Sequence, residues 1–259
     1  MSTIIVTGAA SGMGRACVDR VRGLADVVVA VDLREPQIEG AVGMACDIAD
    51  PAQVAELAEA AAGTGLFRGL IHAAGLSPTM ADPRRIFEVD LLGTQLLLDA
   101  FEERLAPGSA AVCFASMASY QIEPFVNDEH RALLEDPRAP DFLDRGAEMA
   151  PDSGLAYGLA KFGVRRAVER AAVRWGRGGG RVNSVSPGII ETPMGRREMA
   201  EQPMMQSMLD STPLGRMGRA EEVAAVAAFL VSDDAAYVTG IDVRVDGGTV
   251  AATTAPPPA

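Results

Sequence analysis

The chain alternates short runs of apolar, mostly β-branched residues with longer segments in which apolar residues recur at helical spacing. Near-continuous apolar strands are typical of a parallel sheet that helices cover on both faces. The repeated order of strand, helix and strand therefore predicts an α/β fold with a doubly wound parallel sheet. The predicted strands span residues 3–7, 27–31, 69–74, 110–115, 181–185 and 242–245.

Three segments show the helical spacing most clearly, and they span residues 52–61, 84–105 and 220–231. The first of them follows Asp50 and Pro51, which suit the N-cap and the first helical position. Apolar residues in each segment fall on one face, so the three helices are expected to pack against the sheet.

No linker or internal repeat divides the chain, so residues 1–250 are predicted to form one domain. Apolar residues make up 48% of the sequence, but no run of 18 uninterrupted apolar residues is present that would span a membrane. The start is apolar for only a few residues and lacks a basic flank, which argues against a signal peptide. The Pro- and Ala-rich ending, residues 251–259, is predicted to be disordered.

The formal net charge of −12 has the wrong sign for holding a phosphate backbone, so we expect no nucleic-acid partner. Cys17, Cys46 and Cys113 lie far apart, with neither metal-ligand spacing nor the even count of a disulfide framework. We therefore expect no metal site, and a cytoplasmic location, where thiols stay reduced.

A glycine-rich stretch, "TGAASGMG" at residues 7–14, directly follows the first predicted strand. Gly8, Gly12 and Gly14 let the backbone approach a pyrophosphate, and a helix beginning near Arg15 supplies free N–H groups and a favourable dipole. A glycine triplet alone is equally typical of an ordinary tight turn. Its place in the first turn from strand to helix indicates a dinucleotide-binding loop.

An acid, Asp32, ends the second predicted strand. At this place a carboxylate can accept hydrogen bonds from the adenosine ribose hydroxyls. A 2′-phosphate would face the charge at about 4 Å, a repulsion on the order of 4 kcal/mol at an effective dielectric constant near 20. We therefore expect NAD rather than NADP, although Arg34 is a residue type that can accommodate the extra phosphate if it is not simply a solvated loop charge.

Lys161 is the only lysine among 23 basic residues, and it stands four residues after Tyr157. Residues four apart on a helix share one face, so both side chains can point at one bound cofactor. A tyrosine of pKa about 10 becomes a base at neutral pH only if about 4 kcal/mol favours its phenolate, and an ammonium at about 4 Å provides that order of energy. Lys also brings three rotatable donors on a flexible stem, which suits this role better than the planar fork of Arg.

Taken together, the ordered motifs resemble those of the classical short-chain dehydrogenases/reductases, from Ile4 to about Gly248. They are "TGAASGMG" at 7–14, "CDI" at 46–48, "HAAG" at 72–75, "YGLAK" at 157–161 and "SPGIIETP" at 186–193. The layout is most similar to that of the bacterial 3α-hydroxysteroid dehydrogenases/carbonyl reductases. This resemblance implies a single-domain Rossmann fold and an NAD-dependent oxidoreductase that interconverts secondary alcohols and ketones.

The resemblance also implies roles for individual residues. Tyr157 would be the catalytic acid/base, Lys161 its partner, and Ser116 the hydroxyl that orients the substrate carbonyl. A homodimer or homotetramer is expected on the same ground. The cofactor-binding residues implied are Gly8, Ser11, Gly12, Met13, Gly14, Asp32, Leu33, Asp47, Ile48, Ala74, Gly75, Tyr157, Lys161, Pro187, Gly188, Ile190 and Thr192.

Two positions depart from the family pattern. The family's Asn-Asn-Ala-Gly is His-Ala-Ala-Gly at residues 72–75, a change expected to cost little because these residues mostly present backbone. The helix Asn that supports a relay water near the lysine in the family is Asp90. Asp90 either accepts the same hydrogen bonds in a working relay or pairs with Lys161 or a helix neighbour, and both interpretations stay open.

An acidic, Pro-punctuated insertion is expected near residues 120–153. It is predicted to hold two short helices, the first with Asn127 as its N-cap and Pro137 beyond its end. The insertion is expected either near the active-site mouth or on the helix face that many relatives use to dimerise. His130 within it is a candidate second acid or, as the simpler interpretation, a solvated side chain.

Six of the 12 methionines lie between Glu191 and Gly218, a segment that closes over the substrate in the family. Met is polarizable and adaptable, which favours a bulky apolar, steroid-like or cyclic ketone or alcohol, with core filling under a mobile lid as the alternative. Two other functions stay open. One is reduction of 3-oxoacyl thioesters, which the acidic composition disfavours, and the other is NAD(H) sensing without turnover, which Asp90 alone supports.

Overall fold

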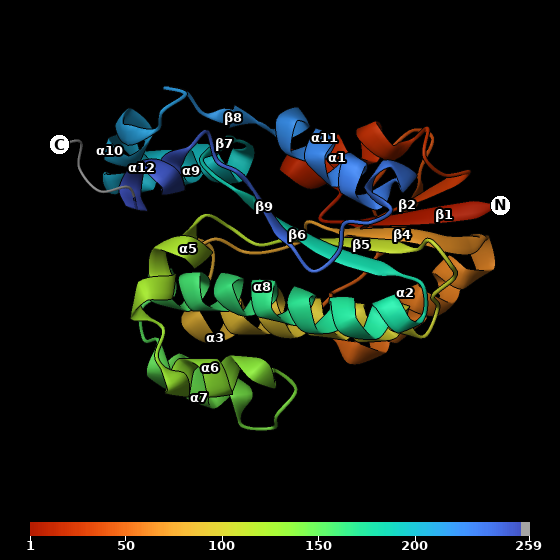
Figure 1. Cartoon of the computed structure of the whole chain (residues 1–259), viewed down its shortest axis with the longest axis horizontal. Coiled ribbons are helices and arrows are strands. Elements are labelled where there is room, and N and C mark those ends of the chain that lie inside the picture. Colours follow the sequence, from red (N-terminus) through yellow and green to blue (C-terminus); the bar gives the residue numbers. More distant parts are fainter. Residues whose placement is uncertain (255–259) are drawn as a thin grey trace.

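Seven parallel strands form the central sheet of the computed structural model, which describes residues 1–254 (Figure 1). Helices cover both faces of this sheet, so the predicted doubly wound Rossmann fold is confirmed. The strands lie in the order β3-β2-β1-β4-β5-β6-β9. Their bounds are β1 Ser2–Thr7, β2 Val27–Asp32, β3 Val42–Ala45, β4 Leu66–His72, β5 Ala110–Phe114, β6 Arg181–Pro187 and β9 Asp242–Val245.

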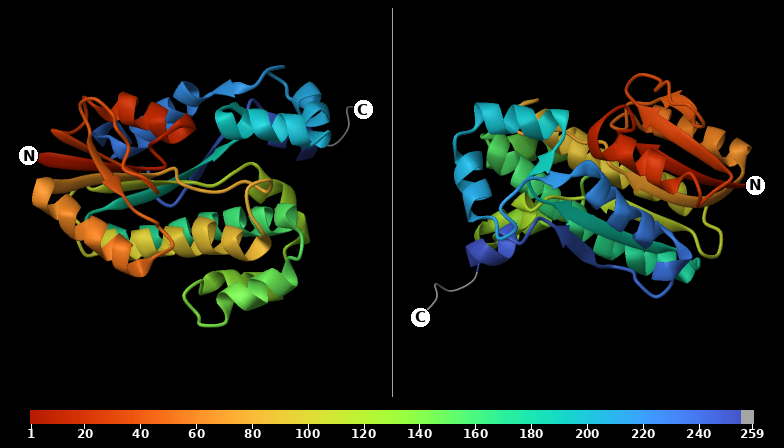
Figure 2. Two further views of the ribbon diagram at one scale, coloured as in Figure 1. Left: turned by 180° about the vertical axis from the view of Figure 1, so that it is seen from behind. Right: turned by 90° about the horizontal axis from the view of Figure 1, so that it is seen from above.

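The helices α1 and α11 cover one face of the sheet, and α2, α4 and α8 cover the other (Figures 1 and 2). Buried residues of α1 and α11 form one apolar cluster with the sheet, and those of α2, α4 and α8 form the second. The burial of apolar side chains in these two layers is what fixes the sheet between them. The bounds are α1 Gly12–Val21, α2 Pro51–Thr64, α4 Gly93–Glu102, α8 Ser153–Arg177 and α11 Ala220–Val231.

The strand order reverses at β1, which pairs with β2 on one side and β4 on the other. In open α/β sheets a ligand crevice forms beside the carboxyl ends of the strands at such a reversal. Thr7, the last residue of β1, is in register with Val31 and His72, so three strands end together here. The glycine-rich stretch starts at this point.

Asp50 caps α2 as predicted, because its Oδ1 accepts the Ala52 N–H at 2.9 Å and Pro51 stands at the first position. The helix predicted over residues 84–105 is instead interrupted. A short helix, α3 (Pro83–Ile86), is followed by a π-helical turn, η1 (Phe87–Leu92), before α4 begins. Such π turns are frequent at functional sites, and the apolar spacing of the sequence does not reveal them.

Three short strands were missed, because two-residue or half-exposed strands lack an apolar run. They are β3 at the sheet edge and the parallel pair β7 (Ile190–Glu191) and β8 (Gly218–Arg219). The predicted disorder of the tail is wrong for residues 251–254, which belong to α12 (Thr249–Thr254), while 255–259 lie outside the described residues. Val250 anchors this helix because its side chain is 2% exposed in an apolar cluster.

The insertion holds the two predicted helices, α6 (Asp128–Glu135) and α7 (Phe142–Met149). The Asn127 Oδ1 accepts the His130 N–H at 2.9 Å, so the predicted N-cap is confirmed, and the His130 ring in turn accepts the Asn127 N–H. Both helices lie beneath α8 and α3 as a separate outer layer (Figures 1 and 2). The two helices therefore lie at the helix face, whereas Gln121 and Asp152, near the ends of the insertion, line a cavity beside Tyr157, so each expected position holds for part of the insertion. The bounds of the remaining elements are α5 Ala118–Ile122, η2 Glu123–Phe125 and η3 Asp233–Ala235.

Within residues 1–254, no helix is both long enough and apolar enough to cross a membrane. All three cysteines are buried and free, and burial raises the pKa of the Cys17 and Cys113 thiols to about 12. They are therefore core residues without thiolate character.

Candidate active site

The glycines of the first turn leave no room for side chains. Gly8 has φ +69°, and a Cβ there would lie 2.7 Å from the Ala74 amide nitrogen. A Cβ on Gly14 would overlap the Gly8 carbonyl oxygen. The loop therefore presents bare backbone where α1 begins, at Gly12, and no acidic residue stands in the first turn of this helix to compete for its N–H groups.

A cavity of about 240 Å³, here called the dinucleotide pocket, opens over this loop. It contains most of the residues implied as cofactor contacts. Its walls come from the carboxyl ends of β1, β2 and β4 and from the residue before α9 (Pro193–Glu201). The implied residues that line it are Gly8, Ser11, Gly12, Met13, Gly14, Asp32, Leu33, Asp47, Ile48, Ala74, Gly75 and Thr192.

Asp32 is held in place by backbone at the rim of the dinucleotide pocket. Its Oδ2 accepts the Ala10 N–H at 3.0 Å and its Oδ1 accepts the Leu33 N–H at 2.8 Å. Arg34 is exposed and is not among the residues that line this pocket.

Arg85 lines the dinucleotide pocket, and the sequence analysis missed it. Its guanidinium bonds Asp47 and Glu88, each at 2.8 Å, and these two carboxylates offset its charge. No motif marks this arginine, because its place depends on the short helix α3 that precedes the π turn.

A second cavity of about 400 Å³, here called the tyrosine pocket, contains Ser116 and Tyr157. Met13 and Thr192 line both pockets, so the two adjoin. The implied residues Pro187, Gly188 and Ile190 stand in the tyrosine pocket rather than the dinucleotide pocket. Four methionines of the 191–218 segment also line it, namely Met194, Met204, Met205 and Met208.

The methionine-rich segment forms two helices, α9 and α10 (Met204–Ser211), beside the end of the sheet (Figure 1). Met199 and Met217 do not line the tyrosine pocket but pack against a small core of Met117, Ile189 and Val250. The methionines therefore divide by position, because four line the cavity and two fill the layer beneath it.

Lys161 and Asp90 form a buried pair beside Gly75, and neither of the two residues lines the dinucleotide pocket or the tyrosine pocket. The Lys161 Nζ lies 3.8 Å from the Asp90 Oδ2 and donates to the Phe114 carbonyl at 3.1 Å. The side chains are 6% and 0% exposed. Gly75 makes the pair possible, because a Cβ there would lie 2.9 Å from the Asp90 Oδ1 and 3.1 Å from the Lys161 Nζ.

The π turn η1 brings Asp90 to this position. The Asp90 Oδ1 accepts the Leu76 N–H at 2.8 Å, and its Oδ2 faces Lys161 without a hydrogen-bond partner in the described chain. Burial raises the pKa of the Asp90 carboxyl, while Lys161 and the Leu76 N–H lower it. The geometry thus shows the pairing that the sequence analysis left as one of two interpretations, and the relay stays a hypothesis.

Tyr157 lies on α8 one turn before Lys161, and the Lys161 Nζ is 5.7 Å from the centre of its ring. Burial raises the pKa of Tyr157, the Ser116 hydroxyl lowers it, and the charges of Asp90 and Glu198 raise it. We expected Lys161 to dominate and to lower this pKa. The structure corrects that expectation, because the ammonium is directed to Phe114 and Asp90 and the half-buried phenol loses hydration.

His72, which replaces an Asn of the family pattern, bridges two threonines behind the dinucleotide pocket. Its Nδ1 lies 2.8 Å from the Thr7 hydroxyl and its Nε2 lies 2.9 Å from the Thr94 hydroxyl. The Thr94 hydroxyl donates its only proton to the Asp90 carbonyl oxygen at 2.7 Å. Its oxygen must therefore accept a hydrogen bond from the N–H group at Nε2 of His72. Burial, and secondarily Lys161, lower the pKa of His72 to about 3, so the ring is neutral. This residue does more than present backbone, contrary to our expectation.

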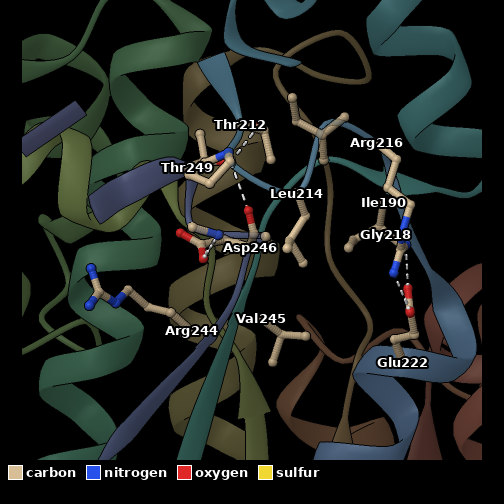
Figure 3. Close-up of a pocket in the computed structure, with 14 residues that line it drawn as sticks. Ile190, Thr212, Leu214, Arg216, Gly218, Glu222, Arg244, Val245, Asp246 and Thr249 are labelled. Atoms are coloured by element: carbon tan, nitrogen blue, oxygen red, sulfur yellow. Dashed lines mark hydrogen bonds and ion pairs between the residues drawn. The ribbon is translucent and has the colours of Figure 1, made fainter. Parts of the chain in front are cut away.

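A third cavity of about 500 Å³ lies between the loop before β8 and the turn after β9 (Figure 3). Its polar side chains bond one another, with Arg216 on Glu222 at 2.7 and 2.9 Å and Thr212 on Thr249 at 2.8 Å. Arg244 extends away from the other labelled side chains in Figure 3. Because no tyrosine or lysine of the described chain lines this cavity, the smaller tyrosine pocket is the better candidate site despite its size.

Comparisons with known proteins identify the family of this chain. A family model described as Enoyl-(Acyl carrier protein) reductase matches residues 8–131 and 144–250. The 3-alpha-hydroxysteroid dehydrogenase/carbonyl reductase of Comamonas testosteroni is 31% identical over 257 residues, covering 96% of each chain. The cis-4-hydroxycyclohexanecarboxylate dehydrogenase of Sinomonas cyclohexanicum is 33% identical over 268 residues, covering 95% of this chain and 96% of that relative.

Among solved structures, the 3-alpha-hydroxysteroid dehydrogenase from Pseudomonas sp. B-0831 complexed with NADH superimposes with a TM-score of 0.83. It is 28% identical and the match covers 98% of both chains. The match of the family model to most of the chain, together with relatives above 30% identity along nearly its full length, shows that this protein belongs to the short-chain dehydrogenases/reductases, a family of oxidoreductases that act on alcohols and ketones.

Proposed function

We propose that this protein is an NAD-dependent oxidoreductase that interconverts a secondary alcohol and a ketone on a bulky, largely apolar, cyclic or steroid-like substrate. The observation that carries the proposal is the shared wall of the two pockets. Ser116 and Tyr157 line a methionine-rich cavity that adjoins the dinucleotide pocket at Met13 and Thr192. A substrate carbon in the first cavity would thus stand next to a nicotinamide ring bound across that wall.

The glycine loop supports a dinucleotide, because it offers bare backbone and a helix N-terminus where a pyrophosphate needs them. Asp32 supports NAD over NADP, since a 2′-phosphate would meet its carboxylate. Arg34 does not line the pocket, and the charge of Arg85 is already offset by Asp47 and Glu88. When bound, NAD supplies the hydride acceptor at nicotinamide C4.

The residues of this chain divide the remaining work. Tyr157 exchanges the hydroxyl proton, and Ser116 hydrogen-bonds the substrate oxygen as its charge changes. The raised pKa of Tyr157 keeps the phenol protonated, which suits it to donate a proton to a ketone. In the oxidation direction the phenolate must form, so the rate is expected to rise with pH. Lys161 binds the ribose hydroxyls, and Asp90 offsets its charge in the apolar interior.

Reduction of 3-oxoacyl thioesters is less well supported. No Arg or Lys lines the tyrosine pocket within the described chain. Two arginine pairs could form a docking patch for such a substrate, Arg165 with Arg166 and Arg196 with Arg197. Both pairs are engaged, since Arg165 bonds Glu123 at 2.8 Å and Arg197 bonds Glu201 at 2.9 Å. A sensor without turnover is disfavoured by Ser116 and Tyr157 facing one cavity, a placement that cofactor binding alone does not need.

A panel of cyclic secondary alcohols with NAD and NADP, read by absorbance of the reduced cofactor, tests the proposal. We expect turnover with bulky cyclic alcohols and at least about a hundredfold preference for NAD in kcat/KM. Tight NADH binding without turnover on the whole panel would support the sensor, and turnover confined to 3-oxoacyl thioesters would support the other alternative.

Replacing Tyr157 with Phe tests the assigned chemistry directly. We expect kcat to fall by about 10³-fold, because proton exchange by a positioned side chain contributes 10²- to 10⁴-fold. NADH binding, measured by fluorescence titration, should stay within about twofold of that of the native protein. A variant that retains comparable activity would contradict the mechanism.

A further inference from the structure

Glu198, on α9, brings a carboxyl group into the tyrosine pocket. Tyr157 lines the same pocket, and the charge of Glu198 is one of those that raise the pKa of this phenol. Apart from Asp152, it is the only charged residue among those that line the pocket in the described chain. An otherwise methionine-rich cavity therefore has one acidic wall.

The two acids of this pocket differ in what they do for the fold. The Asp152 Oδ1 accepts the Leu155 N–H at 3.0 Å and thereby caps α8. The Glu198 side chain caps no helix within residues 1–254. The arginines beside it in sequence pair elsewhere, Arg196 with Glu191 and Arg197 with Glu201.

The surroundings of Glu198 leave it free to accept a hydrogen bond. Burial raises the pKa of its carboxyl, and a hydrogen bond with the Ser77 side chain lowers it. Ser77 itself is 1% exposed, and its hydroxyl also lies 3.2 Å from that of Thr79. A half-buried carboxyl without an ion pair costs stability, and such costs are typical of functional positions.

We propose that Glu198 determines which substrates are used, by accepting a hydrogen bond from a second hydroxyl group that the substrate carries apart from the reacting oxygen. The preferred substrates are then cyclic diols and hydroxy-ketones rather than simple cyclic alcohols, and carboxylates or phosphates near this wall are rejected. This inference rests on the proposed function, since it assigns the reacting oxygen to Ser116 and Tyr157.

A hydroxyl fits this wall better than an ammonium. The remaining lining is uncharged apart from Asp152 and rich in methionine and isoleucine, with Gln121 and Gln202 as its amide side chains, and a full positive charge would lose hydration there. Both the ionised and the protonated forms of a carboxyl accept a hydrogen bond from a hydroxyl, so recognition does not depend on complete ionisation.

The test compares cyclohexanol with the 1,2-, 1,3- and 1,4-cyclohexanediols as substrates, with NAD. In the native protein we expect at least one diol to exceed cyclohexanol by about tenfold to a hundredfold in kcat/KM. In Glu198→Leu this ratio should fall to about one, whereas Glu198→Gln should retain part of it through its amide oxygen. Glu201→Gln, an exposed position on the same helix, should leave the ratio as it is.

A second readout separates recognition from a structural role. Removing the charge of Glu198 should lower the pKa of Tyr157 and move the rising limb of the pH profile for alcohol oxidation to lower pH in Glu198→Gln. Equal diol preference in the native protein and Glu198→Leu would overturn the inference, as would cyclohexanol turnover without any diol preference. Absence of turnover on all four alcohols and on the wider panel would instead contradict the proposed function.

Discussion

The two pockets that meet at Thr192 are built from different material. The floor of the dinucleotide pocket is backbone at the ends of β1, β2 and β4, where Gly8 and Gly14 leave no space for a methyl group, although Met13, Met80 and Met194 also line it. The tyrosine pocket is walled by methionine side chains on α9 and α10, above a small core that includes Val250. The backbone of the dinucleotide pocket is therefore rigid, whereas the shape of the tyrosine pocket can adjust to the molecule bound in it.

This difference separates what the fold requires from what the individual protein selects. Backbone geometry can recognise a pyrophosphate and a ribose, which are the same in every reaction of the family. Side chains on a peripheral helical segment can be exchanged without disturbing the sheet. Substitutions in the first pocket should thus have large and specific effects, and those in the second should have smaller effects that depend on the substrate.

The largest effect is expected from Gly14→Ala in the dinucleotide pocket. The added Cβ would overlap the Gly8 carbonyl oxygen, so the loop must shift away from the position that holds a pyrophosphate. We expect NADH affinity, measured by fluorescence titration, to fall by about a hundredfold or more, which corresponds to the loss of roughly 3 kcal/mol.

Gly23→Ala provides the matched control, because a Cβ there would meet nothing within 4 Å. Its NADH affinity should stay within about twofold of the native value. If Gly14→Ala bound NADH as well as Gly23→Ala does, the contrast between a rigid and an adaptable pocket would fail.

The next effect concerns His72, which ties the strand ends behind the same pocket. Its folded pKa of about 3 lies below the ordinary 6.5, so between these values the unfolded chain binds a proton that the folded chain does not. Stability is therefore lost as the pH falls through 6.5. Between pH 7.5 and pH 5 the free energy of unfolding should decrease by about 2 kcal/mol on account of this residue.

Urea unfolding of the native protein and of His72→Asn at both pH values measures this contribution. Asn does not titrate, so the variant should lack this part of the acid sensitivity even if it is less stable at pH 7.5 because the bonds to Thr7 and Thr94 change. An equal pH dependence in the two proteins would show that the ring is not held neutral as the structure indicates.

The same contrast explains how much could be predicted from the sequence. The dinucleotide pocket was largely predictable, because glycine spacing and an acid at a strand end are local patterns, and the structure places Gly8, Gly14 and Asp32 along one cavity. Tyr157 and Lys161 were predictable from their spacing on one helix face. Residues whose role depends on non-local packing were not, and Arg85 and Glu198 are the clearest cases.

The buried charges of Asp90 and Lys161 likewise could be predicted from the sequence only in part. Asp90 was noticed as a departure, but its orientation depends on the π turn η1, which apolar spacing does not reveal. The effect of Lys161 on Tyr157 was overestimated because spacing fixes the shared helix face and not the partners. In the folded chain the ammonium turns to Phe114 and Asp90.

Asp90→Asn tests this central charge. Removing the carboxylate takes away one of the charges that raise the pKa of Tyr157, so the phenolate forms at lower pH. The rising limb of kcat/KM for alcohol oxidation should move to lower pH, and the rate at a pH below that limb should increase by about threefold to tenfold. A limb that stayed in place or moved to higher pH would contradict this effect of the Asp90 charge on Tyr157.

The smallest effect is expected from Val250→Ala beneath the tyrosine pocket. This side chain is 2% exposed in the core that supports α10, and removing two methyl groups from such a place costs roughly 1 to 2 kcal/mol. Because the methionines above can adjust, we expect KM for a bulky alcohol to rise by only about threefold while NADH affinity stays unchanged. Val173→Ala on the exposed face of α8 is the control and should alter neither value. If Val250→Ala weakened NADH binding as strongly as substrate binding, the two pockets would respond together to a change in the core. The difference in how they are built would then have no functional consequence.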